Sequence, residues 1–339
     1  MEEKRILILA QVVVEETRSD YYIVDLEAGE ILKTEIQSLL NGGEGDMVKL
    51  GRIIYNIGGL RLIDECPPVV IPAAYGDHHR HLGASCIDLN SFDDNDDAPP
   101  PPPLHLSKKW KWKDIPPMND FRVYPSCVSL DGKLYALHCL SQRSHIGEVF
   151  DPCLGQWEPL PPPPSDIPVR SMFVSPRVIS DEKKHRLLVH IANTYSLYAY
   201  YPDLRSWDCL APAFSPWFPP AAITLVDDIL FLTLHDNLPR CIAAFDLLSK
   251  TWLEVKFSSN FPAYDIAFNE WESMLHLGDG NLCLATFRIS GGNPVQTNLW
   301  FVKLRFQRIS SQDLLLTFVS SHQFPPFQGR LRANCFIIL

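Results

Sequence analysis

Residues 149–157 read Val-Phe-Asp-Pro-Cys-Leu-Gly-Gln-Trp, and the same pattern returns along the chain. Each copy has two apolar residues, then Asp or a residue in its place, then a turn, and Trp six positions after the Asp. Clear copies end at Trp157, Trp207 and Trp252, and a copy that an insertion interrupts ends at Trp112. Successive tryptophans are therefore 45, 50 and 45 residues apart. A period of this length is typical of repeat arrays that are built from small β-sheets.

A second apolar run precedes each of these Asp positions, and a tight-turn signal comes before several of the runs. The turn signal 130–132 (Leu-Asp-Gly) precedes the run 133–137, and 226–228 (Val-Asp-Asp) precedes the run 228–232. Asp and Gly suit tight hairpins because they tolerate positive φ. Short strands at regular spacing predict four-stranded, all-β blades. We expect the Trp of each blade to fill the wedge between blades, and the Asp to accept hydrogen bonds from the turn that follows it.

These stretches resemble the kelch repeat. Residues 55–59 (Tyr-Asn-Ile-Gly-Gly) resemble the kelch strand that ends in a double glycine, and 132–135 (Gly-Lys-Leu-Tyr) resemble the start of such a strand. Residues 151–157 resemble the third-strand Asp with its later Trp. The resemblance covers most of the chain, although other copies replace the double glycine, for example by His138-Cys139. The chain looks most similar to divergent plant kelch proteins related to F-box proteins, and the resemblance implies a β-propeller.

We predict one domain, residues 1–339, that folds as an all-β, kelch-type β-propeller with six four-stranded blades. Five blades follow in order along the chain, at 44–114, 120–160, 168–212, 219–256 and 261–319. The sixth has three strands between residues 6 and 32 and lacks its innermost strand. The apolar segment 333–339 can supply this strand, so we expect pairing of the N- and C-terminal segments to close the ring and remove exposed sheet edges. Seven blades are the alternative, which requires 261–319 to divide differently.

Composition and charge restrict the partners and the compartment. The net charge of −10 argues against nucleic acid, because phosphate contacts need a basic surface. The N-terminal apolar run directly follows charged residues and is too short for a membrane span, so we predict neither a secretory signal nor a membrane partner. Nine cysteines without a C-x-x-C pair indicate reduced thiols and a cytoplasmic protein, with the nucleus as a second compartment. Residues 91–107 are acidic and then proline-rich, which predicts a disordered loop.

The sequence offers little of the chemistry that an enzyme needs. Residues 77–81 (Asp-His-His-Arg-His) are the best cluster of metal ligands, but neighbours along a chain do not easily face one ion, and Arg80 would repel a cation. No Gly-rich phosphate loop or G-x-S-x-G turn is present. We expect the innermost strands, 264–268 among them, to carry Asp265 as their one carboxylate. We therefore predict no enzyme activity, no catalytic or metal-binding residues and no cofactor. The alternative is a metal-dependent lyase or oxidase that uses the central pocket of the ring, and a divergent member without a selected activity also stays open.

The prediction is instead a non-enzymatic protein–protein interaction module. Loops between the second and third strands of each blade gather on one face of a propeller and form a rigid recognition surface. Arginine is enriched where binding energy concentrates. The residues expected to contact a protein partner are charged or polar and lie in three of these loops: Arg143, His145, Asn237, Arg240, His79 and Arg80. We expect a monomer without an F-box of its own, because a strand begins by residue 5 and leaves no room for that helical adaptor.

Overall fold

In the computed structural model of the protein, most described residues lie in β-strands. The structure describes residues 7–15, 18–25, 30–33, 46–58, 84–88, 112–120, 122, 125–138, 145–164, 176–191, 196–212, 214, 222–233, 242–259, 273–290, 296–324, 327–328 and 330–338. The only helix within these ranges is a short 3-10 helix, Glu182–Lys184. None of the described helical structure is long and apolar enough to cross a membrane.

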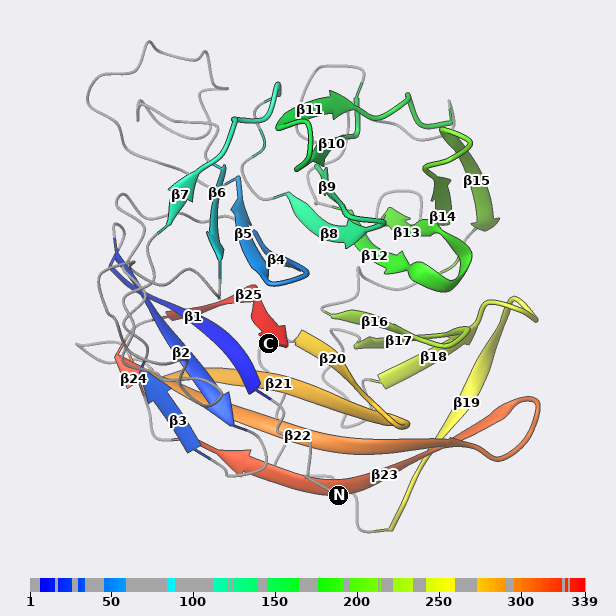
Figure 1. Cartoon of the computed structure of the whole chain (residues 1–339). Helices are drawn as coiled ribbons and strands as arrows, with labels where there is room; N and C mark the ends of the chain where they lie inside the picture. Colours follow the sequence, from blue (N-terminus) through cyan, green and yellow to red (C-terminus); the bar gives the residue numbers. More distant parts are fainter. Residues whose placement is uncertain are drawn as a thin grey trace, which may run out of the picture.

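The strands form six four-stranded units around an axis, which we number as blades 1 to 6 (Figure 1). In blades 2, 3 and 4, the four strands follow one another along the chain, and the first strand of each blade lies innermost. Blade 2 contains β4 (Asp46–Leu50), β5 (Ile53–Ile57), β6 (Ala84–Asp88) and β7 (Lys113–Asp114). Blade 3 contains β8 (Ser126–Leu130), β9 (Lys133–Leu137), β10 (Gly147–Asp151) and β11 (Gln156–Pro159). Blade 4 contains β12 (Arg177–Asp181), β13 (Arg186–Ile191), β14 (Ser196–Tyr201) and β15 (Ser206–Ala211).

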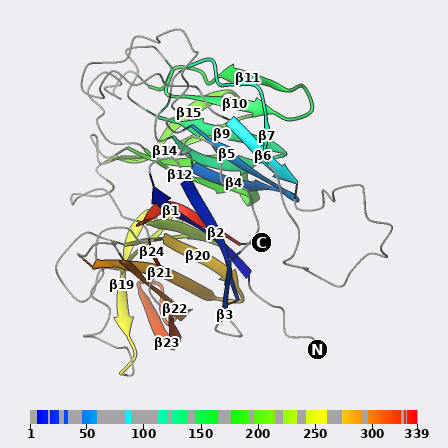
Figure 2. The same cartoon turned by 90° about the vertical axis from the view of Figure 1, so that its left-hand side faces the viewer.

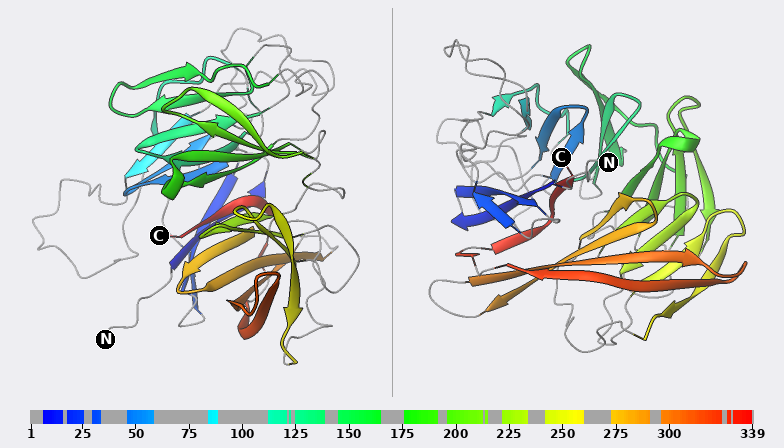
Figure 3. Two further views of the ribbon diagram at one scale, coloured as in Figure 1. Left: turned by 90° about the vertical axis from the view of Figure 1, so that its right-hand side faces the viewer. Right: turned by 60° about the horizontal axis from the view of Figure 1, so that its bottom comes forward.

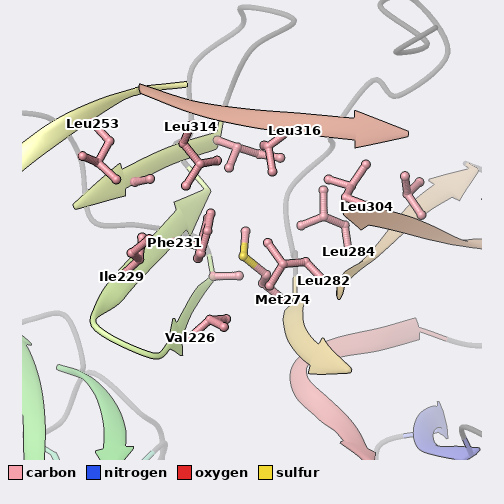
Figure 4. Close-up of a cluster of buried hydrophobic side chains, with 14 residues drawn as sticks. Val226, Ile229, Phe231, Leu253, Met274, Leu282, Leu284, Leu304, Leu314 and Leu316 are labelled. Carbon is pink, nitrogen blue, oxygen red and sulfur yellow. The ribbon is translucent and has the colours of Figure 1, made fainter. Parts of the chain in front are cut away.

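Blades 5 and 6 share one continuous sheet. Blade 5 contains β16 (Ile223–Val226), β17 (Ile229–Thr233), β18 (Ile242–Asp246) and β19 (Thr251–Phe257). Blade 6 contains β20 (Ser273–Gly278), β21 (Asn281–Ser290), β22 (Gln296–Arg308) and β23 (Asp313–Gln323), and the two-residue β24 (Phe327–Gln328) pairs with β22. The outermost strands β19 and β23 pair in parallel, so the two blades enclose a common core to which Phe231 and Leu304 contribute (Figure 4). The long β22 and β23, drawn in orange to red, run across one side of the ring (Figure 3).

Blade 1 joins the two ends of the chain. It contains β25 (Arg330–Ile338) as its innermost strand, followed by β1 (Leu7–Glu15), β2 (Arg18–Asp25) and β3 (Glu30–Lys33). The pairing of β25 with β1 is antiparallel and places Ile338 opposite Ile8. The innermost strands β25, β4, β8, β12, β16 and β20 each lie beside the next, and β20 lies beside β25. Figure 2 shows blade 1 between blade 2 and blade 6. The predicted six blades, and closure by the N- and C-terminal segments, are confirmed.

The repeated tryptophans connect neighbouring blades, as the sequence predicts. Trp157 Nε1 donates to the carbonyl oxygen of Pro116 at 2.8 Å, and Trp207 Nε1 donates to that of Pro161 at 3.2 Å. Both acceptors lie just after the outermost strand of the preceding blade. Trp157 is 7% exposed and fills its wedge, whereas Trp252 is 40% exposed. The aromatic filling therefore weakens toward blade 5.

The Asp of the repeat also has its predicted role. Asp151 Oδ1 accepts a hydrogen bond from the backbone N–H of Cys153 at 2.9 Å, and Asp246 Oδ1 accepts one from that of Leu248 at 2.8 Å. Each carboxylate thus satisfies backbone donors of the turn between the third and fourth strands. The same device recurs at the same position of blades 3 and 5.

Two predicted segments lie outside the described residues. The acidic and proline-rich loop 91–107 is one of them, and the innermost strand expected at 264–268 is the other. The structure shows that the innermost strand of blade 6 is β20, which begins at Ser273. The prediction of an innermost strand at 264–268 is therefore wrong. The innermost strand pairs with β21, and this pairing begins where Ser273 lies opposite Ala285.

Candidate functional site

The two ends of the blades differ, and we call them the turn face and the loop face. The turn face holds the connections between first and second strands and between third and fourth strands, which are short in the described blades apart from residues 89–112 of blade 2. The ion pairs Lys183–Asp227 and Lys184–Asp228 join the turns of blades 4 and 5 there, and the side chains of His185 and Asp131 are in contact between the turns of blades 4 and 3. The loop face holds the connections between second and third strands, and in blades 2 to 6 these include 59–83, 139–144, 192–195, 234–241 and 291–295.

Of the six residues predicted to contact a partner, the structure describes only one. His145 is half-buried, and its Nδ1 lies 3.3 Å from the carbonyl oxygen of Leu160, at the exit of β11. This contact holds the end of its own loop against blade 3. The other five predicted residues lie outside the described residues: Arg143, Asn237, Arg240, His79 and Arg80.

A buried ionic network lies just below the loop face of blade 3. Arg122 is 1% exposed and donates to the carbonyl oxygen of His138 at 3.3 Å and to Glu148 Oε1 at 3.2 Å. The backbone N–H groups of Asn119 and Asp120 each donate to the Glu148 carboxylate at 2.8 Å. Buried charges are costly unless they are paired and hydrogen-bonded, so this network holds the entry into blade 3 and the end of β9 in one geometry. No repeat signal in the sequence predicts it.

A polar series lies at the loop-face end of the axis. Asp46, Ser126 and Arg177 are the first residues of three consecutive innermost strands, β4, β8 and β12. Asp46 Oδ2 accepts from the Cys127 N–H at 2.6 Å, and Ser126 Oγ accepts from the Val178 N–H at 3.3 Å. Each bond joins the innermost strand of one blade to that of the next. Arg177 occupies the corresponding position in blade 4. Its guanidinium has only donors, so it cannot accept a hydrogen bond from the backbone of the next innermost strand.

Asp46 corrects a prediction about the axis. The sequence predicts Asp265 as the one carboxylate on the innermost strands, whereas Asp46 begins β4 and is 7% exposed. A signal for it exists in the sequence. Because side chains alternate between the two faces of a strand, Asp46 shares a face with Val48 and Leu50 and occupies a position where an apolar residue is expected.

Burial and the charge of Arg177 set the protonation of its neighbours. Burial raises the pKa of Asp46 to about 7, and the hydrogen bond from Cys127 and the charge of Arg177 oppose this shift. Burial lowers the pKa of His190 to about 4, and the charge of Arg177 lowers it further. His190 is therefore neutral at neutral pH, and Asp46 keeps its proton to a higher pH than an exposed carboxyl does.

Several buried polar atoms near the loop face have no hydrogen-bond partner. In the described ranges they include Oδ1 of Asp46, Oδ1 of Asn56, Nε of Arg122 and both ring nitrogens of His190. These side chains belong to blades 2, 3 and 4 and lie at, or lead into, the loop-face ends of their strands. Buried polar groups in proteins are nearly always paired with protein or ordered water, so these atoms mark the polar part of the loop-face end. Trp112 and Asn281 also have such an atom. Within the same ranges, no three His, Cys, Asp or Glu side chains are grouped so that they could hold a metal ion.

Comparison with known proteins finds plant relatives of low identity. No protein-family model matches the chain. An F-box/kelch-repeat protein of Arabidopsis thaliana is 31% identical over 71 residues, which are 20% of this chain and 20% of that protein. A second Arabidopsis thaliana F-box/kelch-repeat protein is 21% identical over 209 residues, which are 60% of this chain and 51% of that protein. The matches thus span about half or less of the length of these relatives.

Among solved structures, a crystal structure of a nidogen/laminin complex contains a similar chain. The similarity has a TM-score of 0.49 at 9% sequence identity and covers 94% of this chain and 99% of that chain.

Proposed function

We propose that this chain, a divergent relative of plant F-box/kelch-repeat proteins, is a non-enzymatic module that recognises a protein partner through its loop face. One observation carries the proposal. In each of blades 2 to 6 the second strand ends, and the third begins, at the same face, so five connections gather there on a closed ring of strands. Loops held on a rigid scaffold are the usual place of recognition residues.

Two features of the structure support the choice of this face. On the turn face, the hairpins of blades 3 to 5 have short connections, and ion pairs and a His185–Asp131 contact join neighbouring turns. On the loop face, the buried network of Arg122 and Glu148 holds both the entry into blade 3 and the end of β9, from which the loop 139–144 departs. In this proposal Arg143, Arg240, Asn237 and the remaining predicted residues contact the partner.

The proposal extends to the setting in which the module works. It acts as a monomer without a cofactor, in the cytoplasm and the nucleus, and binds neither nucleic acid nor membrane. The relatives carry an F-box in their names. A ubiquitin-ligase role for this chain therefore depends on an F-box that another polypeptide or another segment supplies.

The test is affinity purification of the tagged protein from plant extract, with mass spectrometry of the partners and metal analysis of the same eluate. The loop-face variant combines Arg143→Glu with Arg240→Glu, and its matched control combines Lys183→Glu with Lys250→Glu on the turn face. A stoichiometric protein that the loop-face variant loses and the control retains supports the proposal. Loss of the partner only in the turn-face control contradicts it.

One observation favours the alternative of an enzyme that uses the centre of the ring. Asp46, Arg177 and His190 place titratable and charged groups near the axis, where such an enzyme needs them. Perturbed pKa values gather at active sites more often than elsewhere. Stoichiometric iron, copper or zinc in the eluate, without a protein partner, would replace the recognition proposal by this one.

A further inference from the structure

Arg177 and His190 lie side by side near the axis. In the antiparallel pairing of β12 with β13 these two residues are directly opposite each other, so both side chains leave the same face of blade 4. Leu188, two residues before His190, packs into the core between blades 4 and 5, and the His190 ring lies 5.7 Å from that of Phe214. The shared face of Arg177 and His190 is therefore the one that faces blade 5.

His190 is a buried imidazole without a hydrogen-bond partner. It is 1% exposed, and neither ring nitrogen has a partner. A buried polar group that is left unpaired costs free energy, and its persistence calls for a group that pairs with it in some state of the protein. A neutral imidazole has one N–H donor and one acceptor nitrogen to offer.

The charge next to His190 selects an anion. Arg177 is half-buried at the start of an innermost strand, and its charge acts on both His190 and Asp46. Asp46 Oδ2 accepts from Cys127, and Asp46 Oδ1 has no hydrogen-bond partner, so the Asp46 carboxyl is a second group near the axis on which the charge of Arg177 acts. A guanidinium and an imidazole N–H together form charge-assisted hydrogen bonds to a carboxylate, whereas a cationic group would be repelled.

We propose that Arg177 and His190 form a binding site for a carboxylate group at the loop-face end of the ring axis. This inference rests on the proposed function in one respect: it takes the loop face as the side from which a protein partner approaches. The carboxylate has two sources, an acidic side chain of a partner or a free small carboxylic acid. Arg177 is half-buried and His190 is 1% exposed, so in this proposal the ligand meets Arg177 first.

The first experiment uses glutarate as the probe and the imidazole NMR signals of His190 as the readout. The full chain is labelled at its eleven histidines, and the His190 signals are assigned by their loss in a His190→Gln variant. Glutarate is titrated at constant ionic strength, and the neutral glutaramide is titrated as its control. Saturable shifts of the His190 signals with glutarate alone support the site. No shift with glutarate, or an equal shift with glutaramide, overturns it.

Variants and a second ligand locate the site and its source. Arg177→Gln is expected to weaken glutarate binding by about tenfold or more, whereas Lys183→Gln, at the other end of the same hairpin, leaves it unchanged. Equal binding by Arg177→Gln and the wild type contradicts the assignment. A blocked tripeptide Ala-Glu-Ala that binds more tightly than glutarate, with no binding of its Gln counterpart, identifies an acidic side chain as the source. Binding of glutarate without the Glu peptide identifies a small acid. The glutarate titration and the affinity purification test different statements. The purification can fail to find a partner while the titration confirms the carboxylate site.

Discussion

Replacing Asp46 by Asn should change how the stability of the protein depends on pH. Asp46 begins the innermost strand of blade 2, is 7% exposed, and accepts a 2.6 Å hydrogen bond from Cys127 in blade 3. Its second oxygen has no partner. Asn has nearly the same shape and keeps an acceptor oxygen for Cys127, but it carries no charge at any pH. The variant therefore removes the titration and preserves the contact.

The direction and the size of this change in stability follow from the pKa of Asp46. Burial raises it from 3.8 to about 7, so between these two values the folded chain holds a proton that the unfolded chain has lost. Stability therefore falls as the pH rises through this window, and the contribution is complete below the unfolded value. Each pKa unit corresponds to about 1.4 kcal/mol, and the slope falls off as the pH approaches the folded pKa, so raising the pH from 5 to 7 costs the wild type about 2 kcal/mol from this group.

Urea unfolding of wild type and variant at several pH values between 5 and 8 measures this term. The free energy of unfolding of Asp46→Asn relative to wild type should rise by about 2 kcal/mol from pH 5 to pH 7 and level off above. Asp151→Asn is the control, because the hydrogen bonds from Lys133 and from the turn lower the pKa of Asp151. Its contribution is lost only as the pH falls below the ordinary range of a carboxyl. A constant difference between wild type and Asp46→Asn from pH 5 to pH 8 would refute the reasoning.

Three further outcomes test the ring itself. Deletion of 333–339 removes most of the pairing of β25 with β1, so we expect a lower melting temperature and loss of near-ultraviolet circular dichroism; a truncated chain that melts like the full-length one contradicts closure. Trp157→Phe removes a 2.8 Å hydrogen bond to the neighbouring blade and should cost about 1 to 2 kcal/mol in urea unfolding, more than Trp252→Phe, whose side chain is 40% exposed. Arg308→Met removes the side chain that donates a 2.7 Å hydrogen bond to the buried Asp246 carboxylate across the shared sheet of blades 5 and 6. We expect the free energy of unfolding to fall by about 1 to 3 kcal/mol, and by less in 1 M salt if the pair acts through charge.

The repeated elements were predictable because their causes are local. Residues 133–137 were predicted as a strand from the turn signal before them and their apolar residues, and they form β9. The Asp-to-Trp spacing predicts both the turn that Asp151 caps and the position of Trp157. A hairpin and its turn need only residues that are close in sequence, so their pattern is visible there.

The candidate site was much less predictable. Among the predicted contact residues, only His145 falls in the described part of the chain, where it bonds to the backbone of its own blade. Asp46 and Cys127, which share a hydrogen bond, are 81 residues apart. Arg177 and His190 belong to one hairpin, but their nearness to Asp46 depends on the order of three blades around the axis. The repeat spacing predicts the order of these blades, but not which of their side chains meet at the axis.

By itself, the sequence determined an all-β ring of repeated blades and the means of closing it, because period, turn residues and the apolar character of the last strand are local properties. It also determined the net charge of −10. Only the tertiary structure decided which polar residues meet at the axis and that blades 5 and 6 fuse through the parallel pairing of β19 with β23. The physical reason is that the burial of these side chains and the pKa of Asp46 depend on residues from different blades. Only the closed ring sets the distances between those residues.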